Sequence, residues 1–347
     1  MNPKEIITGL LDLRETPRLP VSLLSGGAWA LNSSGLSMEK ALSENPEKVA
    51  EILYGAYMGV GSDIVWTTSG YSNIVVGALG AEIKFRQKGT PDVIDTRIKD
   101  VSDIDGIDLN KISDDGRIRT LVKITNSMAK KTGGKNYLAL NRWGPFTTAG
   151  LLYGAENLMR GIYHRPDDIR RLLDFTADLY IKYSRLYIDN GADLILLSEP
   201  TSSGDMIARK HFESFAIPAF RKVYDALRAQ GVRTALHICG NITDRLDLLN
   251  GIGTEFVSVD YKVDLGRCRE VFNGKTAFAG NMNPVAVMQR ESPEGVEKAC
   301  RACIAAAGAG PGYMLMPGCD IPPATPAGNI KAMTATGNGQ AAAANRR

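Results

Sequence analysis

Three residues of metal-binding type stand out in this sequence: His237 and Cys239, separated by one residue, and the distant Cys319. Side chains at positions i and i+2 of a β-strand point to the same face, so His237 and Cys239 would face one way and Ile238 the other. Three ligands of His and Cys type leave the fourth tetrahedral position of Zn²⁺ open to water or substrate. The pattern therefore predicts a catalytic zinc site, although a His-x-Cys pair taken alone is more often a core histidine beside a buried cysteine.

The composition sets the context for this site. The chain has 347 residues and a formal net charge of +3, with no basic stripe, so a nucleic-acid partner is not expected. No apolar run reaches the roughly 18 residues that a membrane-spanning helix needs, so no membrane partner is expected either. Five cysteines, an odd number, without a signal-peptide pattern fit a reducing compartment. We predict a cytoplasmic protein.

The elements that must position the three ligands are short apolar runs that alternate with longer segments of helical period. Alternating strands and helices predict a parallel sheet with right-handed crossovers, and eight such units predict an α/β fold of the (β/α)8 TIM barrel type. A doubly wound open sheet is the alternative. The runs that predict strands are residues 19–25, 63–68, 137–141, 193–199, 233–239, 256–260, 276–280 and 312–316.

Two segments depart from this alternation. Residues 80–135 contain hairpin-like and polar stretches, which predict an insertion between strands 2 and 3 of the barrel. Residues 336–347 offer little that could join a core, which predicts a flexible tail. The predicted organisation is therefore a single barrel domain over residues 1–335, followed by the tail.

The barrel prediction also tests the metal hypothesis. Active sites of these barrels lie at the carboxyl ends of the strands. His237 and Cys239 end the fifth predicted strand, and Cys319 follows the eighth. Glu199 ends the neighbouring fourth strand, so we predict that it is catalytic, either as a fourth ligand that substrate displaces or as a general base. The alternative for Glu199 is a solvated loop acid.

The sequence around these residues resembles a known family. Ala-Leu-His-Ile-Cys-Gly-Asn at 235–241, Ala-Gly-Asn at 279–281 and Pro-Gly-Cys at 317–319 are similar to the zinc-dependent corrinoid methyltransferases of the uroporphyrinogen decarboxylase superfamily. The resemblance implies a (β/α)8 barrel in which His237, Cys239 and Cys319 bind zinc. It also implies a separate corrinoid-binding protein that docks at the barrel mouth and exchanges a methyl group between its cobalt and a small molecule. A homodimer is compatible with it.

The same comparison argues against porphyrinogen decarboxylation. Decarboxylases of the superfamily carry an arginine-bearing motif near the start, and residues 21–30 contain no arginine. Two other classes remain as alternatives to the methyltransferase: a metal-free lyase on the same barrel, and a zinc-stabilised binding protein. The pair Cys300 and Cys303 lies on a predicted barrel helix, and we interpret these thiols as buried or idle.

The substrate side of the site is predicted from side chains near the strand ends. An aromatic lining favours a flat apolar ligand, so demethylation of a methoxylated aromatic is the first hypothesis, and methylation of a thiol of coenzyme M type is the alternative. The thiol would require a fixed cation, such as Arg142. The aromatic residues could equally just close the barrel top, and the asparagines could cap helices. The predicted substrate-binding residues are Trp29, Trp66, Tyr71, Trp143, Asn241, Asn281 and Met316.

Overall fold

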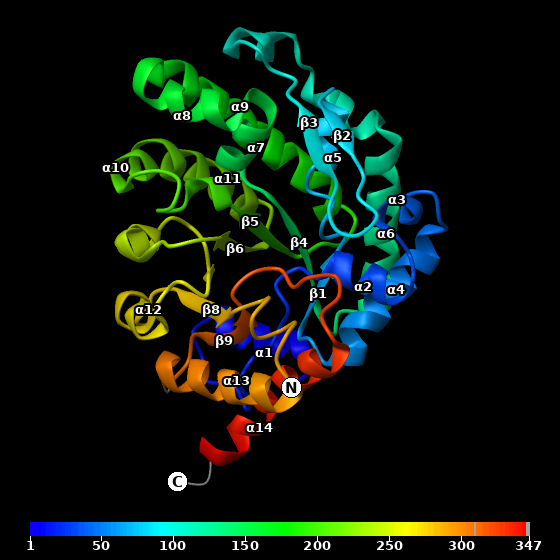
Figure 1. Cartoon of the computed structure of the whole chain (residues 1–347), viewed down its shortest axis with the longest axis vertical. Coiled ribbons are helices and arrows are strands. Elements are labelled where there is room, and N and C mark those ends of the chain that lie inside the picture. Colours follow the sequence, from blue (N-terminus) through cyan, green and yellow to red (C-terminus); the bar gives the residue numbers. More distant parts are fainter. Residues whose placement is uncertain (309, 345–347) are drawn as a thin grey trace.

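A curled parallel sheet forms the centre of the computed structural model, which describes residues 1–308 and 310–344 (Figure 1). Each pair of neighbouring strands is parallel, as expected for an α/β fold. The strands are almost entirely buried, which explains why they appear in the sequence as apolar runs. In spatial order they are β1 (Ile64–Thr67), β4 (Tyr137–Trp143), β5 (Leu194–Ser198), β6 (Arg233–Ile238), β7 (Phe256–Val259), β8 (Ala277–Met282) and β9 (Tyr313–Pro317).

The predicted first strand, residues 19–25, is reduced to a single bridge. Val21 pairs in parallel with Leu315 of β9, and the Leu315 amide donates to the Pro20 carbonyl at 3.0 Å. On the other side, the amide of Asp63, next to β1, donates to the Val21 carbonyl at 2.9 Å. Proline has no amide hydrogen to give to a ladder. The segment therefore joins the two sheet edges without being a regular strand, an arrangement consistent with a (β/α)8 barrel.

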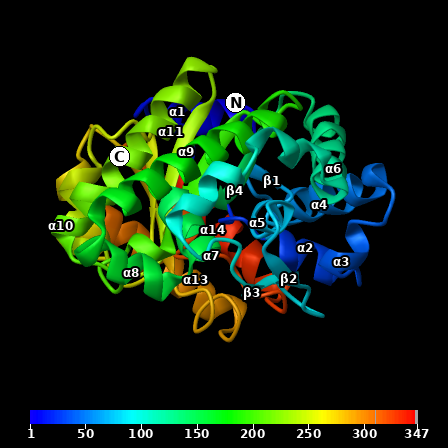
Figure 2. The same cartoon turned by 90° about the horizontal axis from the view of Figure 1, so that it is seen from above.

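Helices surround the curled sheet (Figures 1 and 2). In α4, for example, the Asn45 side chain accepts hydrogen bonds from the amides of Glu47 and Lys48, and the helix ends at Gly61 with φ 74°. No helix among the described residues has the length and apolar character needed to cross a membrane. The α-helices are α1 (Pro3–Leu11), α2 (Gly27–Ser33), α3 (Met38–Ala41), α4 (Pro46–Val60), α5 (Ile74–Ala78), α6 (Gly116–Thr132), α7 (Pro145–Tyr153), α8 (Ala155–His164), α9 (Pro166–Ile188), α10 (Arg209–His211), α11 (Ile217–Ala229), α12 (Leu265–Phe272), α13 (Pro293–Ala307) and α14 (Ala327–Ala344).

Shorter helical turns complete the loops. They are η1 (Val101–Gly106), η2 (Leu109–Asp114), η3 (Pro200–Ser202), η4 (Phe212–Ala216), which is a π-helix, and η5 (Thr243–Leu249). Of these, η3 and η5 follow β5 and β6 directly, so they lie at the carboxyl edge of the sheet. This is the edge at which barrels of this kind carry their sites.

The segment 80–135 is not confirmed as one insertion. Its first part forms an antiparallel hairpin of β2 (Glu82–Lys84) and β3 (Asp92–Asp95), which contacts α5. Its last part is α6, which packs against α4, β1 and β4. Such packing is that of the crossover helix in a β-α-β unit. The sequence signal was misleading because the polar stretch before α6 hid the start of a regular helix.

The C-terminal helix changes the predicted tail boundary. α14 continues to Ala344, well into the segment 336–347 that the sequence assigns to a flexible tail, while residues 345–347 lie outside the described part of the chain. Gly337 explains part of this. A Cβ atom at Gly337 would lie 2.1 Å from Cγ2 of Val21, so α14 approaches the segment that joins the sheet edges very closely.

This contact predicts a contrast between two glycines of one helix. Gly337→Ala should lower the free energy of unfolding by about 1–3 kcal/mol, because the added methyl group has no space beside Val21. Gly339→Ala is the matched control, since a Cβ there meets nothing within 4 Å, and it should stabilise the helix by about 0.5–1 kcal/mol. Urea unfolding of both variants measures the difference. Equal effects would show that α14 does not pack as described.

Candidate metal centre

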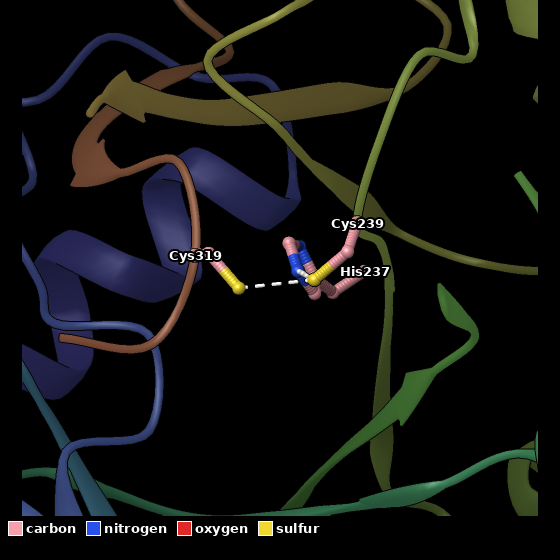
Figure 3. A group of neighbouring side chains, drawn as sticks. All are labelled: His237, Cys239 and Cys319. Carbon is pink, nitrogen blue, oxygen red and sulfur yellow. Dashed lines mark hydrogen bonds between the residues drawn. The ribbon is translucent and has the colours of Figure 1, made fainter. Parts of the chain in front are cut away.

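His237, Cys239 and Cys319 meet at the carboxyl edge of the sheet (Figure 3). Nε2 of His237, at the end of β6, lies 3.0 Å from Sγ of Cys239, and that sulfur lies 3.0 Å from Sγ of Cys319 in the loop after β9. The three ligand atoms all lie within 4.8 Å of one another. In the part of the chain that the structure describes, these are the His, Cys, Asp or Glu side chains grouped closely enough to share an ion.

The end of β7 fixes the orientation of His237. His237 is opposite Ser258 in the register of β6 and β7. Its Nδ1 lies 3.1 Å from Oγ and 3.3 Å from the carbonyl oxygen of Ser258. When Nδ1–H donates to these oxygens, Nε2 carries the lone pair and faces the two sulfurs, which is the arrangement that a metal ligand needs.

The same strand end holds the turn after Cys239. One carboxylate oxygen of Asp260 accepts the Gly240 amide at 3.0 Å, and the other accepts the Lys262 amide at 3.0 Å. Gly240 has φ 94°, a conformation that favours glycine and turns the chain away immediately after the ligand. Asp260 therefore sets the position of Cys239 through the backbone.

The loop that carries Cys319 also rests on this strand end. A Cβ at Gly318 would lie 2.5 Å from the Tyr261 amide nitrogen, so only glycine lets the loop come this close. On the other side of Cys319, the carboxylate of Asp320 accepts the Gly26 amide at 2.7 Å, and burial raises the pKa of this carboxyl to about 7. The Cys319 loop is thus held between the end of β7 and the start of α2.

The pKa values of the two thiols are shifted in opposite directions. The hydrogen bond from Cys239 lowers the pKa of Cys319 to about 4, and that same bond, together with burial, raises the pKa of Cys239. Two thiolates 3.0 Å apart repel each other, so the pair keeps one proton between its sulfurs. A divalent cation can take the place of that proton and bind both thiolates with Nε2 of His237. The donor set therefore fits Zn²⁺ with one position left open.

The carboxylate of Glu199 is not part of this cluster and holds α7. Its carboxylate oxygens accept the amides of Phe146 at 3.0 Å and Thr147 at 2.9 Å and the Thr147 hydroxyl at 2.8 Å. Burial raises the pKa of Glu199 to about 7, against the lowering effect of these hydrogen bonds. The side chain is 0% exposed, so the alternative of a solvated loop acid is wrong. Its predicted catalytic role stays a prediction, while its contacts are those of a helix N-cap.

Most of the predicted aromatic lining is buried and occupied by protein contacts. Trp29 and Trp66 donate from Nε1 to the carbonyls of Thr325 at 3.0 Å and Leu23 at 2.7 Å. The Tyr71 hydroxyl donates to the Met38 carbonyl at 2.7 Å, and Met316 is likewise fully buried. Trp143 differs because it is half-buried, with Nε1 donating to Asn73 at 2.7 Å. Among the predicted aromatic residues, Trp143 alone is partly exposed.

The remaining predicted residues have structural contacts. Asn241 is exposed, and its Oδ1 accepts the Thr243 amide at 3.0 Å at the start of η5. Asn281 is buried, and its Nδ2 donates to the carbonyls of Asp260 at 3.0 Å and Val263 at 2.6 Å. Asn281 therefore supports the strand end that holds the ligands.

Arg142 cannot serve as the fixed cation of the mouth. Only 1% of it is exposed, it donates to the carbonyl and hydroxyl oxygens of Thr68, and its guanidinium lies 4.8 Å from the ring centre of Tyr187 on α9. Its side chain thus lies between the sheet and the helical layer. Cys300 is also buried, 3.2 Å from the sulfur of Met282, as the interpretation of an idle thiol requires.

Sequence reasoning missed Ser258. The signal was present, because Ser258 lies two residues before Asp260 and therefore on the same face of a strand that neighbours His237. It was overlooked because serine in an apolar run looks like a neutral core position. Only the register of β6 and β7 places its oxygen next to Nδ1.

Comparison with known proteins places this site in a family. The family model for uroporphyrinogen decarboxylase (URO-D) matches residues 4–339. The chain belongs to the uroporphyrinogen decarboxylase family. The methylcobamide:CoM methyltransferase MtbA of Methanosarcina mazei is 31% identical over 337 residues, covering 95% of this chain and 96% of the relative. The methylcobamide:CoM methyltransferase MtaA of Methanosarcina barkeri is 26% identical and covers 84% of both chains.

A solved structure agrees at the level of the fold. A methyltransferase from Methanosarcina mazei superposes with a TM-score of 0.88 at 23% identity, covering 98% of this chain and 99% of that one. The predicted resemblance to the corrinoid methyltransferases of this superfamily is confirmed, and the chain is an enzyme of the family.

The ligand geometry predicts which cysteines hold metal. The purified protein should contain about one zinc per chain, and Cys239→Ala or Cys319→Ala should lose most of it, because each removes one of three ligands. Cys300→Ala and Cys303→Ala are the matched controls and should retain the metal. Elemental analysis after gel filtration measures the ratio. Equal zinc loss in both pairs would contradict the assignment.

Glu199 provides a separate test. Glu199→Gln replaces one acceptor oxygen by an NH₂ group that opposes the donors of Thr147, so the free energy of unfolding should fall by about 1–3 kcal/mol. Zinc content should not change. Glu156→Gln, an exposed residue of α8, is the control and should have almost no effect. Loss of zinc in Glu199→Gln, with stability unchanged, would instead favour a role as metal ligand.

Proposed function

We propose that this enzyme is a zinc-dependent methyltransferase that moves a methyl group from the cobalt of a corrinoid protein to a small thiol of coenzyme M type. The observation that carries the proposal is the group of His237, Cys239 and Cys319 at the carboxyl edge of the sheet. It is supported by relatives named methylcobamide:CoM methyltransferase that match 95% of the chain.

The residues of the chain have defined tasks in this reaction. Cys239 and Cys319 would provide two thiolates and His237 a neutral imidazole, so the complex of these ligands with a divalent cation would carry no net charge. Ser258 keeps Nε2 of His237 directed at the sulfurs, and Asp260 keeps Cys239 in place. Bound zinc would lower the pKa of a substrate thiol, so that a thiolate nucleophile is available at neutral pH.

In the proposed transfer, the proton, the methyl group and the bonding electron pair each have a defined destination. The substrate thiol gives up its proton to solvent, and its sulfur forms a bond to the methyl carbon of the methylated corrinoid. The carbon–cobalt bond breaks, and both of its electrons stay on cobalt. The protein has to hold the two reactants in line for this transfer.

Two observations favour the thiol over a methoxylated aromatic. Trp29, Trp66 and Tyr71 are buried with their polar atoms already bonded, so they are not available to line a pocket for a flat ring. Two relatives that match 95% of the chain, at 31% and 28% identity, carry coenzyme M in their names. The demethylase hypothesis is therefore replaced by its alternative.

The proposal includes a protein partner and a cellular compartment. A corrinoid-binding protein would dock at the carboxyl edge, where η3, η5 and the loop of Cys319 surround the ligands. We propose one (β/α)8 barrel for residues 1–335, with residues 20–22 in the place of the first strand. All five cysteines are free thiols, which supports a reducing setting such as the cytoplasm.

The choice of substrate can be measured directly. Under anaerobic conditions, zinc-loaded protein with methylcob(III)alamin should convert it to cob(I)alamin when coenzyme M is added, and the cobalt absorption reports the change. Cob(I)alamin with a panel of methoxylated aromatics should show no methylation of cobalt. Turnover of the aromatics without any reaction of the thiol would refute the proposed direction and substrate, and would restore the demethylase hypothesis.

A further inference from the structure

Asn141 on β4 lies on the inner face of the barrel, two strands away from His237 on β6. Trp143 is opposite Ser198 in the register of β4 and β5, and Ser198 is opposite His237 in that of β5 and β6. Asn141 precedes Trp143 by two residues and so shares its face of the strand. The intervening Arg142 contacts Tyr187 in the outer helical layer, so Asn141 and Trp143 face the interior together with His237.

The side chain of Asn141 is held in one orientation. The hydroxyl of Ser198 donates to Oδ1 of Asn141 at 2.7 Å. This bond fixes the amide so that its NH₂ group is directed away from Ser198. Asn141 is also half-buried, unlike its fully buried neighbours Leu140 and Arg142, so part of it borders open space.

The NH₂ group of Asn141 has no hydrogen-bond partner among the described residues. Other inward or buried asparagines of the chain do: Nδ2 of Asn136 donates to the Asp63 carbonyl, and that of Asn281 to two carbonyls. A polar donor within a barrel interior is usually satisfied by protein, water or ligand. Asn141 therefore presents a fixed donor to the same interior that the metal ligands face.

We propose that Asn141 is a specificity-determining residue, whose NH₂ group binds an oxygen acceptor at the far end of the thiol substrate. The inference rests on the proposed function. β4 and β6 are separated by β5 alone, and His237 is in register with Trp143, two residues beyond Asn141, so Asn141 and His237 stand about 10–12 Å apart across the wall. This span suits a short thiol with a tail of acceptor oxygens.

The side chains of this part of the wall restrict the chemical class of the substrate's tail. Arg142 is turned outward, so it does not supply the fixed cation expected for a sulfonated thiol, and the wall offers the neutral donor of Asn141 at this point instead. Trp143, half-buried above Asn141 and fixed through Asn73, offers an apolar surface for a short carbon linker. A sulfonate or carboxylate tail on a two-carbon thiol matches this combination, whereas an alkyl tail leaves the donor of Asn141 without a partner.

Binding of two thiols separates this role from a structural one. Isothermal titration of zinc-loaded protein would compare coenzyme M, a two-carbon thiol with a sulfonate tail, with ethanethiol, which lacks the tail. Asn141→Ala should weaken the binding of coenzyme M about tenfold and leave that of ethanethiol unchanged. Asn141→Asp should weaken coenzyme M further, because a carboxylate repels the sulfonate. Ser198→Ala should have a smaller effect in the same direction.

Melting temperature and zinc content of each variant serve as controls and should match the wild type. Equal loss for both thiols, or no loss for coenzyme M in either Asn141 variant, would overturn the role of Asn141. If the wild-type protein holds zinc but binds neither thiol, the proposed function itself fails and this inference with it. That outcome is recognisable because it appears before any substitution is made.

Discussion

Contacts with the end of β7 bring the three metal-binding side chains together. Ser258 orients the imidazole of His237, and Asp260 accepts the amide that follows Cys239. Gly318, next to Cys319, packs closely against the backbone nitrogen of Tyr261. Ligands separated by 80 positions in the chain thus rest on residues 258–261, at the end of one strand. Loss of the residues that orient metal ligands typically lowers metal affinity about 10- to 100-fold. This strand end is therefore as much a part of the site as the sulfurs.

The barrel makes that arrangement possible. The last strand, β9, must lie near the N-terminal segment for Cys319 to reach β6, and the hydrogen bonds of residues 20–22 with β9 and with Asp63 hold it there. Asp320 adds a second tie, to the start of α2. The cost of the arrangement is electrostatic. Two sulfurs held 3.0 Å apart cannot both be thiolates without a cation, so the fold positions a pair of ligands whose full ionisation requires metal.

Much of the architecture could be predicted from the sequence for a simple reason. Strands buried on both faces appear as apolar runs, and the alternation of residues in a strand placed His237 and Cys239 together before any fold was known. What could not be predicted depends on contacts between distant segments. Trp66 was expected to line the mouth, but its indole donates to Leu23 inside the wall. Glu199 was expected near the metal, but the amides of α7 hold both of its oxygens. In both cases the predicted place of the residue at a strand end was correct. The hydrogen-bond partner of its polar group decided the direction of the side chain.

X-ray absorption at the zinc edge tests the central claim most directly, because it counts the atoms around the metal. The account predicts two sulfur neighbours and one imidazole nitrogen for the zinc-loaded protein, from Cys239, Cys319 and His237. Adding coenzyme M should raise the number of sulfur neighbours to three, since the open position takes the substrate thiol. A site with four protein ligands that does not change when the thiol is added would contradict the account.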